Sequence, residues 1–352
     1  MESPIVIKNR LNWIDWAKTI AIMLVVFGHI PEDEGNFLIH YVVLIHMPLF
    51  FFISGYLTKK EFFCNTTLKK YYHTLIIPYF CYNIIFIPYW VVRHFIEVSN
   101  AEWYDIIRPI LGTLLLQFSS SFCEPLNEVT WFIAALLAMK IILSICNKFK
   151  YGIAILFVLA IISTLTYIIN EGTRLCTDLP FVGFVKCLPF FLLGHFCKQK
   201  NWICEKPKKM DLFLCLAGIS ISLAAYAFKR NTPGLMVYGV CFWTSSITAI
   251  ISILSLCRSL DKIYMIIIDN ISIGTIVIMG LHWILIGVTN FTLSKLLHVP
   301  NITYPVWGAI LLTFIYTAVL YPVIILFKDY YPFLLGKNIV HNKSYFLKNE
   351  NY

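Results

Sequence analysis

The chain has 352 residues, of which 59% are hydrophobic and only 13% are charged, and its net charge is +9. A soluble globular domain has about 25% charged residues, because polar groups must cover its surface, so this composition excludes that class. The positive charge does not indicate a nucleic-acid partner, because the Lys and Arg residues lie between apolar runs rather than on one basic face. The composition is that of a chain whose solvent is lipid, so membrane lipid is its first expected partner.

Long apolar runs follow one another along the sequence and are bounded by polar or turn residues. Each is close to the roughly 20 residues that one membrane crossing needs, and lipid forces the backbone to satisfy its hydrogen bonds internally. The runs are continuous, which excludes the alternating segments of about ten residues that form membrane barrels. The sequence therefore predicts an all-α integral membrane protein of about ten transmembrane helices, at 13–30, 38–57, 74–92, 129–147, 152–169, 180–197, 211–228, 234–256, 266–289 and 304–327.

The connections between these runs predict the orientation. Most of the 28 Lys and Arg residues fall in alternate connections, which the positive-inside rule assigns to the cytoplasm. Both termini are therefore expected to be cytoplasmic, with a membrane domain at 1–337 and a polar tail at 338–352. The run at 106–118 is too short to span and is expected to lie in the interface or re-enter. The predicted location is the inner (plasma) membrane.

The first run carries three ionisable residues, Asp15, Lys18 and His29. Such residues are costly inside a bilayer and are functional hypotheses by default. At 100° per residue, Lys18 lies about 20° from His29 around the helix and Asp15 about 40° from it, so all three share one stripe about 16–21 Å long. The alternative is that Asp15 and Lys18 form an i,i+3 pair near the cytoplasmic interface, with His29 capping the outer end.

The second run has His46, then Pro48, then Ser54 and Gly55. A proline inside a helix frees a carbonyl group, which in a membrane must face protein or a cavity, so a bent helix beside a cavity is expected. His282 lies within the ninth run, where a satisfied core histidine is the simpler alternative to a functional one.

The eleven cysteines are scattered, and most lie inside apolar runs as small hydrophobic residues. Cys123 and Cys176 fall in segments predicted to lie outside, where an oxidising compartment would allow them to pair. No cluster of His, Cys and carboxylate residues has ligand spacing, so no metal site is predicted. A histidine on a polar stripe otherwise suits a general base or a proton carrier. The residues alone indicate a membrane enzyme or a transporter with His29 at its centre.

Several segments resemble the acyltransferase-3 family of membrane O-acyltransferases, and most closely its stand-alone fucose 4-O-acetylase-like group. The opening, NWIDWAK at 12–18 and LVVFGH at 24–29, contains that family's basic-residue-x10-His pattern as Lys18 to His29. The second motif of the family resembles HMPLFFFISGY at 46–56. Shorter matches are Ile77-Pro78-Tyr79, Thr130-Trp131-Phe132 with Leu136, and Gly274-Thr275 leading to His282.

The resemblance implies acetyl-CoA as the acyl donor and a hydroxyl of a cell-surface sugar as the acceptor. It implies His29 as the base, with Asp15 orienting or neutralising Lys18, and the alternative route acetylates His29 first. The residues expected to bind the acceptor are His46, Ser54, Trp131 and His282, and those expected to bind CoA are Lys69, Lys70 and His73.

The chain departs from the family at the donor site. The family often has an arginine pair before the Pro-Tyr of the third helix, where this chain has Lys69, Lys70 and His73. Lysine keeps the charge but does not replace the bidentate geometry of arginine. The basic loop 58–73 is nevertheless expected to attract the phosphates of CoA, together with Lys206, Lys208 and Lys209.

Two other functions remain open from the sequence. One is a transporter or flippase for a polysaccharide intermediate, in which His29 carries protons. Paired broken helices in inverted repeats favour such a protein, and the sequence has one Pro-bent helix of this kind. The other is a non-catalytic partner of a polysaccharide synthase. Nothing in the sequence indicates the oligomeric state or the identity of the sugar.

Overall fold

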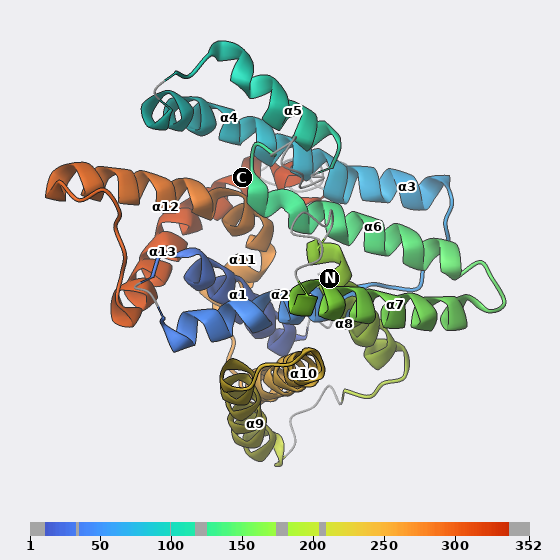
Figure 1. The fold of residues 1–352 in the computed structure, drawn as a ribbon. Coiled ribbons are helices and arrows are strands. Elements are labelled where there is room, and N and C mark those ends of the chain that lie inside the picture. The colour runs from blue at the N-terminus through green and yellow to red at the C-terminus, as the bar shows by residue number, and fades with distance from the viewer. Residues whose placement is uncertain are drawn as a thin grey trace, which may run out of the picture.

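The computed structural model describes residues 11–32, 35–98, 100–116, 125–173, 182–203 and 209–337. Within these residues the regular structure is helical, apart from one isolated bridge between Glu32 and Tyr304, so the predicted all-α class is confirmed. The helices, shown in Figure 1, are α1 (Asn12–His29), α2 (Phe37–Leu57), α3 (Asn65–Tyr71), η1 (Tyr72–Ile76), α4 (Ile77–Glu97), η2 (Trp103–Ile106), α5 (Ile107–Leu114), η3 (Glu128–Thr130), α6 (Trp131–Cys146), α7 (Gly152–Thr173), α8 (Val182–Gln199), α9 (Asp211–Asn231), α10 (Leu235–Ser259), α11 (Ile266–Ile273), α12 (Thr275–Leu297), α13 (Val306–Tyr330) and η4 (Pro332–Leu335).

Among the described residues, eight helical stretches are long and apolar enough to cross a membrane. Helices α1 and α8 correspond to the two other predicted crossings and have 18 residues each. They are less apolar because α1 contains Asp15 and Lys18, while α8 contains Lys186 and Lys198. Most residues of both helices are buried by neighbouring helices or half-buried, so their polar side chains face protein rather than lipid.

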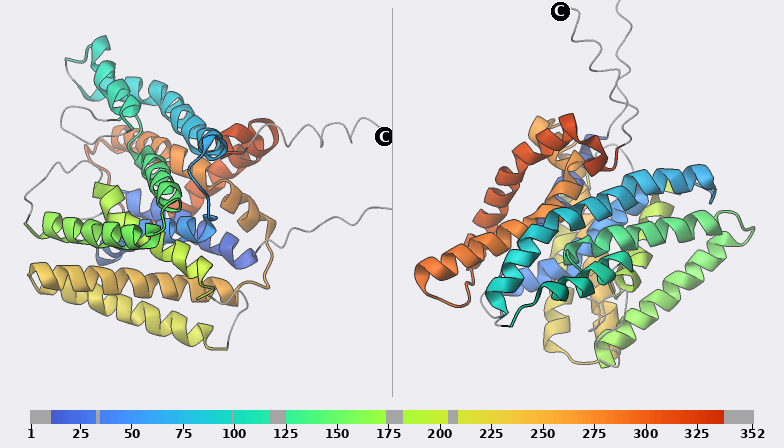
Figure 2. Two further views of the ribbon diagram at one scale, coloured as in Figure 1. Left: turned by 90° about the vertical axis from the view of Figure 1, so that its right-hand side faces the viewer. Right: turned by 90° about the horizontal axis from the view of Figure 1, so that it is seen from above.

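Helix α1 lies inside the bundle and contacts α2, α10, α11, α12 and α13 (Figure 1). Several of its apolar side chains, such as Ala21 and Val25, are completely buried. Helices α9 and α10 form a hairpin at the edge of the bundle, which Figure 2 shows from two further directions. The helix with the ionisable stripe is thus enclosed by five other helices, as expected of an intramembrane functional helix.

The backbones of helices α2 and α8 are in direct contact where the two helices cross. A Cβ atom added at Gly55 would lie 1.9 Å from the Phe191 carbonyl oxygen, and one at Gly194 would lie 2.0 Å from the Phe52 oxygen. Only glycine allows such an approach of two backbones, which is the usual role of small residues between membrane helices. The crossing fixes α2 firmly in the bundle.

Loops predicted to lie on the same side of the membrane contact one another. The Tyr304 N–H donates to the Pro31 carbonyl at 3.1 Å, joining two loops that are predicted to lie outside. At the opposite end, Asn12 Nδ2 donates to the carbonyl groups of Asp261 and Ile263 at 2.8 Å each. We call the first end the outer side and the second the inner side, following the predicted orientation.

The third crossing is longer than predicted, because helical structure runs continuously from Asn65 to Glu97. Its hydrogen bonding becomes π-helical over Tyr72–Ile76, just before Pro78. Proline has no N–H, and its ring crowds the carbonyl group four residues earlier, which belongs to Thr74. The wider turn accommodates this proline, and the basic start of the stretch precedes the apolar part that can cross lipid.

The ninth crossing, predicted as one run at 266–289, is instead broken at Gly274 into α11 and α12. A Cβ atom at Gly274 would lie 2.5 Å from the Ile324 side chain, so the break lies directly against α13. The run at 106–118 contains the eight-residue α5 and does not span, as predicted. Residues 117 and 118 lie outside the described residues.

Candidate active site

Three histidines from three helices meet in the outer half of the bundle. His29 ends α1, His46 lies near the middle of α2, and His282 lies two turns into α12. The His29 ring centroid is 6.0 Å from that of His46 and 5.0 Å from that of His282. Gly28 lies directly beside this pair, since a Cβ atom there would be in van der Waals contact with His46 Cε1 at 3.5 Å. The structure thus brings together three of the predicted site residues.

Each of the three imidazoles is oriented in the same way by its own helix. The Nδ1 atom of His29 lies 2.7 Å from the Val25 carbonyl oxygen, and those of His46 and His282 lie 2.8 Å from the carbonyl oxygens four residues earlier. A carbonyl oxygen only accepts hydrogen bonds, so Nδ1 carries the proton in each ring. Nε2 is therefore the nitrogen with an available lone pair, which is the arrangement required of a general base.

The three rings differ in accessibility. His282 is fully buried at 0% exposure, and His46 is 5% exposed. His29 is partly exposed and lines a cleft of about 690 Å³. This cleft lies on the outer side, between the end of α1, α4, α12 and the loop 300–303. A molecule that enters from the outer side therefore meets the ring of His29 first.

The cleft combines aromatic rings with hydrogen-bonding groups. The Trp283 ring lies edge-on to His29, with centroids 5.3 Å apart, and Tyr89 lines the same cleft. Arg93 Nε donates to both carboxylate oxygens of Glu97, at 3.0 and 2.9 Å. None of these residues was predicted from the sequence. The spacing of four residues between Tyr89, Arg93 and Glu97 places them on one helix face and was the available signal.

Trp131, predicted to bind the acceptor, packs against neighbouring helices. Its ring stacks on Phe51 of α2, with centroids 5.9 Å apart. A Cβ atom at Gly183 would lie 2.3 Å from the indole, so α8 covers the ring as well. The described lining of the cleft includes Trp283 but not Trp131.

Asp15 and Lys18 lie at the other end of α1 from His29 and contact α11. Ser272 Oγ donates to Asp15 Oδ1 at 2.5 Å, and Lys18 Nζ donates to the Ser272 carbonyl oxygen. The stripe is therefore present, and it faces α11 and α12. The two charged residues are separated from His29 by about 16–21 Å along the helix. They hold α11 against α1 and do not contact the three imidazoles.

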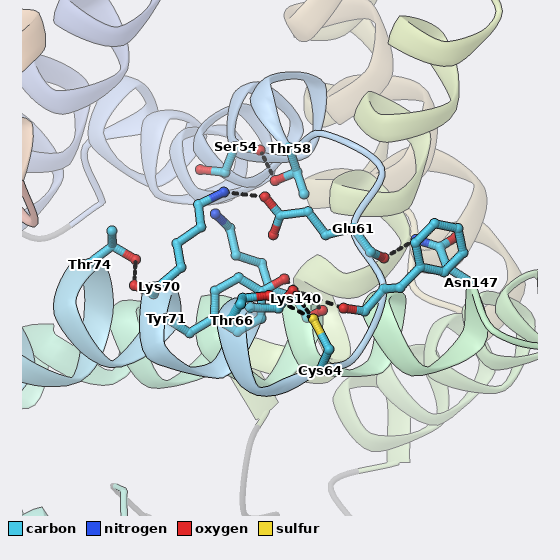
Figure 3. Close-up of polar contacts among 12 residues, drawn as sticks. Ser54, Thr58, Glu61, Cys64, Thr66, Lys70, Tyr71, Thr74, Lys140 and Asn147 are labelled. Atoms are coloured by element: carbon cyan, nitrogen blue, oxygen red, sulfur yellow. Dashed lines mark hydrogen bonds and ion pairs between the residues drawn. The ribbon is translucent and has the colours of Figure 1, made fainter.

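A second polar cluster lies on the inner side, between α2, α3 and α6 (Figure 3). Lys70 forms an ion pair with Glu61, which lies in the loop after α2. Lys140 of α6 has its Nζ atom 5.9 Å from the centroid of the Tyr71 ring. Figure 3 shows both lysines directed toward Glu61, with Ser54 beside them. Ser54 therefore lies near this cluster, about 12 Å along α2 from His46.

The remaining residues predicted to bind CoA lie on the same helical stretch. Lys69 and His73 are exposed, and the His73 ring contacts that of Tyr72 with centroids 5.4 Å apart. Partial burial raises the pKa of the Glu61 carboxyl, but bonds from Lys70 and Tyr71 and the charges of Lys70 and Lys140 outweigh it, so the pKa is lowered. Glu61 is thus a carboxylate at neutral pH, surrounded by cations.

Some predicted features lie outside the described residues, namely Lys206, Lys208 and the proposed partners Cys123 and Cys176. Lys209 is described and exposed. Within the described part of the chain, no group of three or more His, Cys, Asp or Glu side chains has the arrangement of a metal site. The three clustered histidines bind backbone carbonyls through Nδ1, which suits them to act as bases and hydrogen-bonding groups.

Comparison with known proteins gives one match. A family model described as an acyltransferase domain matches residues 11–329, which run from the start of α1 almost to the end of α13. No curated protein matches the chain, and no solved structure matches it. The matched region includes both the histidine cluster and the inner cluster. It supports a membrane acyltransferase and gives no support to the transporter alternative.

Proposed function

Since the chain belongs to the acyltransferase-3 family, we propose that it moves an acetyl group from acetyl-CoA to a hydroxyl of a cell-surface sugar in the inner membrane. In this proposal the chain resembles the fucose 4-O-acetylase-like group. The observation that carries it is the position of His29, whose ring lines an outer cleft while its Nδ1–H is bound to the Val25 carbonyl. This leaves one basic nitrogen available for chemistry at the cleft.

The reaction follows from that nitrogen. The acceptor hydroxyl attacks the carbonyl carbon of the thioester while His29 Nε2 takes the hydroxyl proton. A C–O bond forms, the C–S bond breaks, and CoA leaves as a thiolate that recovers the proton from His29. The bond from Nδ1 to Val25 O at 2.7 Å persists throughout and holds the ring in place. No protein group is consumed, so the base is ready for the next cycle.

The outer cleft supports a carbohydrate acceptor. Sugars present apolar ring faces and many hydroxyl groups, and protein sites bind them through aromatic rings and a few placed polar groups. Trp283 and Tyr89 offer such rings, and Arg93 and Asn290 offer donors and an acceptor within the same cleft. A volume of about 690 Å³ is in the range of small-molecule sites.

The inner side supports a donor that carries phosphates. Lys69, Lys70 and His73 lie on the helical stretch that begins the third crossing, and Lys70 is already paired with a carboxylate there. Bound at this end, CoA would send its pantetheine arm between the helices toward His29. The acetyl group then meets the acceptor hydroxyl in the outer half of the bundle.

The test is acetyl transfer from radiolabelled acetyl-CoA in membranes that contain the full chain. Wild type is compared with His29→Ala and with the control His298→Asn, which changes an exposed histidine in the left-handed cap of α12. We expect label in a glycan or glycolipid with wild type and the control, and none with His29→Ala. Equal labelling by all three would overturn the proposal, as would stopped polymer export with normal acetylation.

A further inference from the structure

Lys140 is a cation within the apolar run of α6, and the proposed chemistry at His29 does not use it. We propose that Lys140 and Lys70 together form a phosphate-binding site, and that Glu61 occupies this site as an internal counter-ion until a phosphate replaces it. The inference rests on the proposed function only in naming the phosphate as one of the CoA donor. The existence of an anion site is argued only from the contacts around Glu61.

The backbone of the Glu61 loop is fixed to the end of α6. Asn147 Nδ2 donates to the Glu61 carbonyl at 2.9 Å, and the Phe63 N–H donates to the Ser144 carbonyl at 3.0 Å. The carboxylate, in contrast, is held by side-chain contacts, chiefly the ion pair with Lys70. Glu61 can therefore leave the lysines by rotating its own side-chain torsions, without unfolding the loop.

Two cations share this single carboxylate. Lys70 is paired with it directly, and the Lys140 charge acts on it as well. Lys140 is half-buried, with its Nζ atom 5.9 Å from the Tyr71 ring centroid. The cluster of Lys70, Lys140 and Glu61 thus has a net charge of +1, and two of its members, Lys140 and Glu61, are partly buried. An ammonium group there gains from an anion with more charge and more acceptor atoms than a carboxylate.

A phosphate has these properties. It offers up to three terminal oxygens against the two of a carboxylate, and two ammonium groups offer six N–H donors. Figure 3 shows Ser54 beside the two lysines, and its hydroxyl adds a neutral donor. Lys70 is 48% exposed at its side chain, so an anion from the inner side reaches the site without crossing the bundle.

The same chemistry belongs to two sources on the inner side, the phosphates of CoA and the headgroup of an anionic phospholipid. The experiment measures binding of CoA to the purified full chain in nanodiscs by calorimetry, in zwitterionic lipid and in lipid with phosphatidylglycerol added. The variants are Glu61→Gln and Lys140→Met. Their controls, Asp329→Asn and Lys262→Met, remove the same charges from exposed inner-side positions outside the cluster.

In zwitterionic nanodiscs we expect Glu61→Gln to lower the Kd for CoA about threefold to tenfold, because the competing anion is gone while the side chain keeps its shape. We expect Lys140→Met to raise this Kd about tenfold, and both controls to match wild type. An unchanged or higher Kd for Glu61→Gln overturns the inference, as does an unchanged Kd for Lys140→Met in protein whose elution profile shows it is folded.

The measurements in nanodiscs with phosphatidylglycerol distinguish the two sources of phosphate. If phosphatidylglycerol weakens CoA binding to wild type and Glu61→Gln alike, the site accepts both phosphates and the inference holds. If the two variants change retention of phosphatidylglycerol but leave the Kd for CoA unchanged, the inference for the CoA donor is overturned and the cluster binds a lipid headgroup instead. Failure of the proposed function is a different result, namely normal CoA binding with no acetyl transfer from wild type.

Discussion

The outer and inner sites hold their polar groups in opposite ways. At the outer site, three imidazoles are bonded through Nδ1–H to uncharged carbonyl groups of their own helices. At the inner site, Lys70 and Lys140 are balanced by the carboxylate of Glu61. An uncharged partner leaves the basic nitrogen free to take up a proton, whereas an ion pair retains affinity for anions. On the proposed function, proton chemistry and anion binding are thus separated along α2.

The largest expected effect breaks the outer site alone. His29→Ala removes the base but no residue of the inner cluster. We expect kcat for acetyl transfer to fall about 100-fold to 10,000-fold, which is the usual contribution of a general base, with the Kd for CoA unchanged. Steady-state rates and calorimetry on the same preparation check this. A large change in CoA affinity would show that the two sites are not separate.

The converse change affects the inner site alone. Lys70→Met removes one cation from the predicted phosphate site, so we expect KM for acetyl-CoA to rise about tenfold with kcat nearly unchanged. Initial rates over a range of acetyl-CoA concentrations measure both constants. A lower kcat at unchanged KM would contradict the assignment, because it would mean that Lys70 acts in the transition state.

A smaller effect is expected at the wall of the outer cleft. Trp283→Ala removes an aromatic ring beside His29, so we expect KM for the acceptor to rise about threefold to tenfold. KM for acetyl-CoA should stay constant, which is the internal control. The matched variant Trp307→Ala changes an exposed tryptophan near the start of α13. If both variants behave alike, the Trp283 ring has no special role.

Ser272→Ala tests whether Asp15 and Lys18 hold helices together. It removes the hydroxyl that donates to Asp15, so we expect a loss of about 1 kcal/mol of stability, as for other polar contacts between membrane helices. The midpoint of thermal unfolding in detergent measures it. Ser259→Ala, in the last turn of α10, is the control. A loss of kcat as large as that of His29→Ala, without a loss of stability, would assign the pair to catalysis.

The smallest effect concerns the thiol at the edge of the inner cluster. Hydrogen bonds with the Thr66 and Thr67 hydroxyls lower the pKa of the Cys64 thiol to about 7. Alkylation requires the thiolate, so labelling should speed up as pH rises and be half-maximal near pH 7 rather than near the ordinary value of about 8.5. Cys64→Ser identifies the labelled site by mass spectrometry, and Thr66→Val should move the midpoint upward.

The membrane class and the helices were predictable because lipid imposes strict rules on length and hydropathy. The stripe on α1 was predictable for the same reason, since helix periodicity alone places Lys18 and His29 on one face. The meeting of His29, His46 and His282 was only implied by motif resemblance. It depends on the packing of three helices, which the period of any one helix does not determine.

The inner cluster was not predictable from the sequence. Lys140 lies within an apolar run, where a single lysine does not indicate a site. Glu61 lies in a polar loop, where a single glutamate is equally ordinary. Their proximity depends on the loop after α2 returning to the end of α6, through the bond from Asn147 to Glu61. Ser54 and Trp131 do not line the described outer cleft, for a related reason. Their motifs are adjacent to histidine helices in sequence, but packing directs their side chains elsewhere.

The glycine crossing of α2 and α8 has a consequence for donor choice. Backbones in such close contact cannot slide or tilt without collision, so α2 keeps its length and position as substrates come and go. His46 and Ser54 lie about 12 Å apart along this one helix, so α2 joins the histidine cluster to the inner cluster. On the proposed function, a donor anchored by its phosphate at the inner cluster brings its acyl group to His29 only if its carrier arm has the matching length.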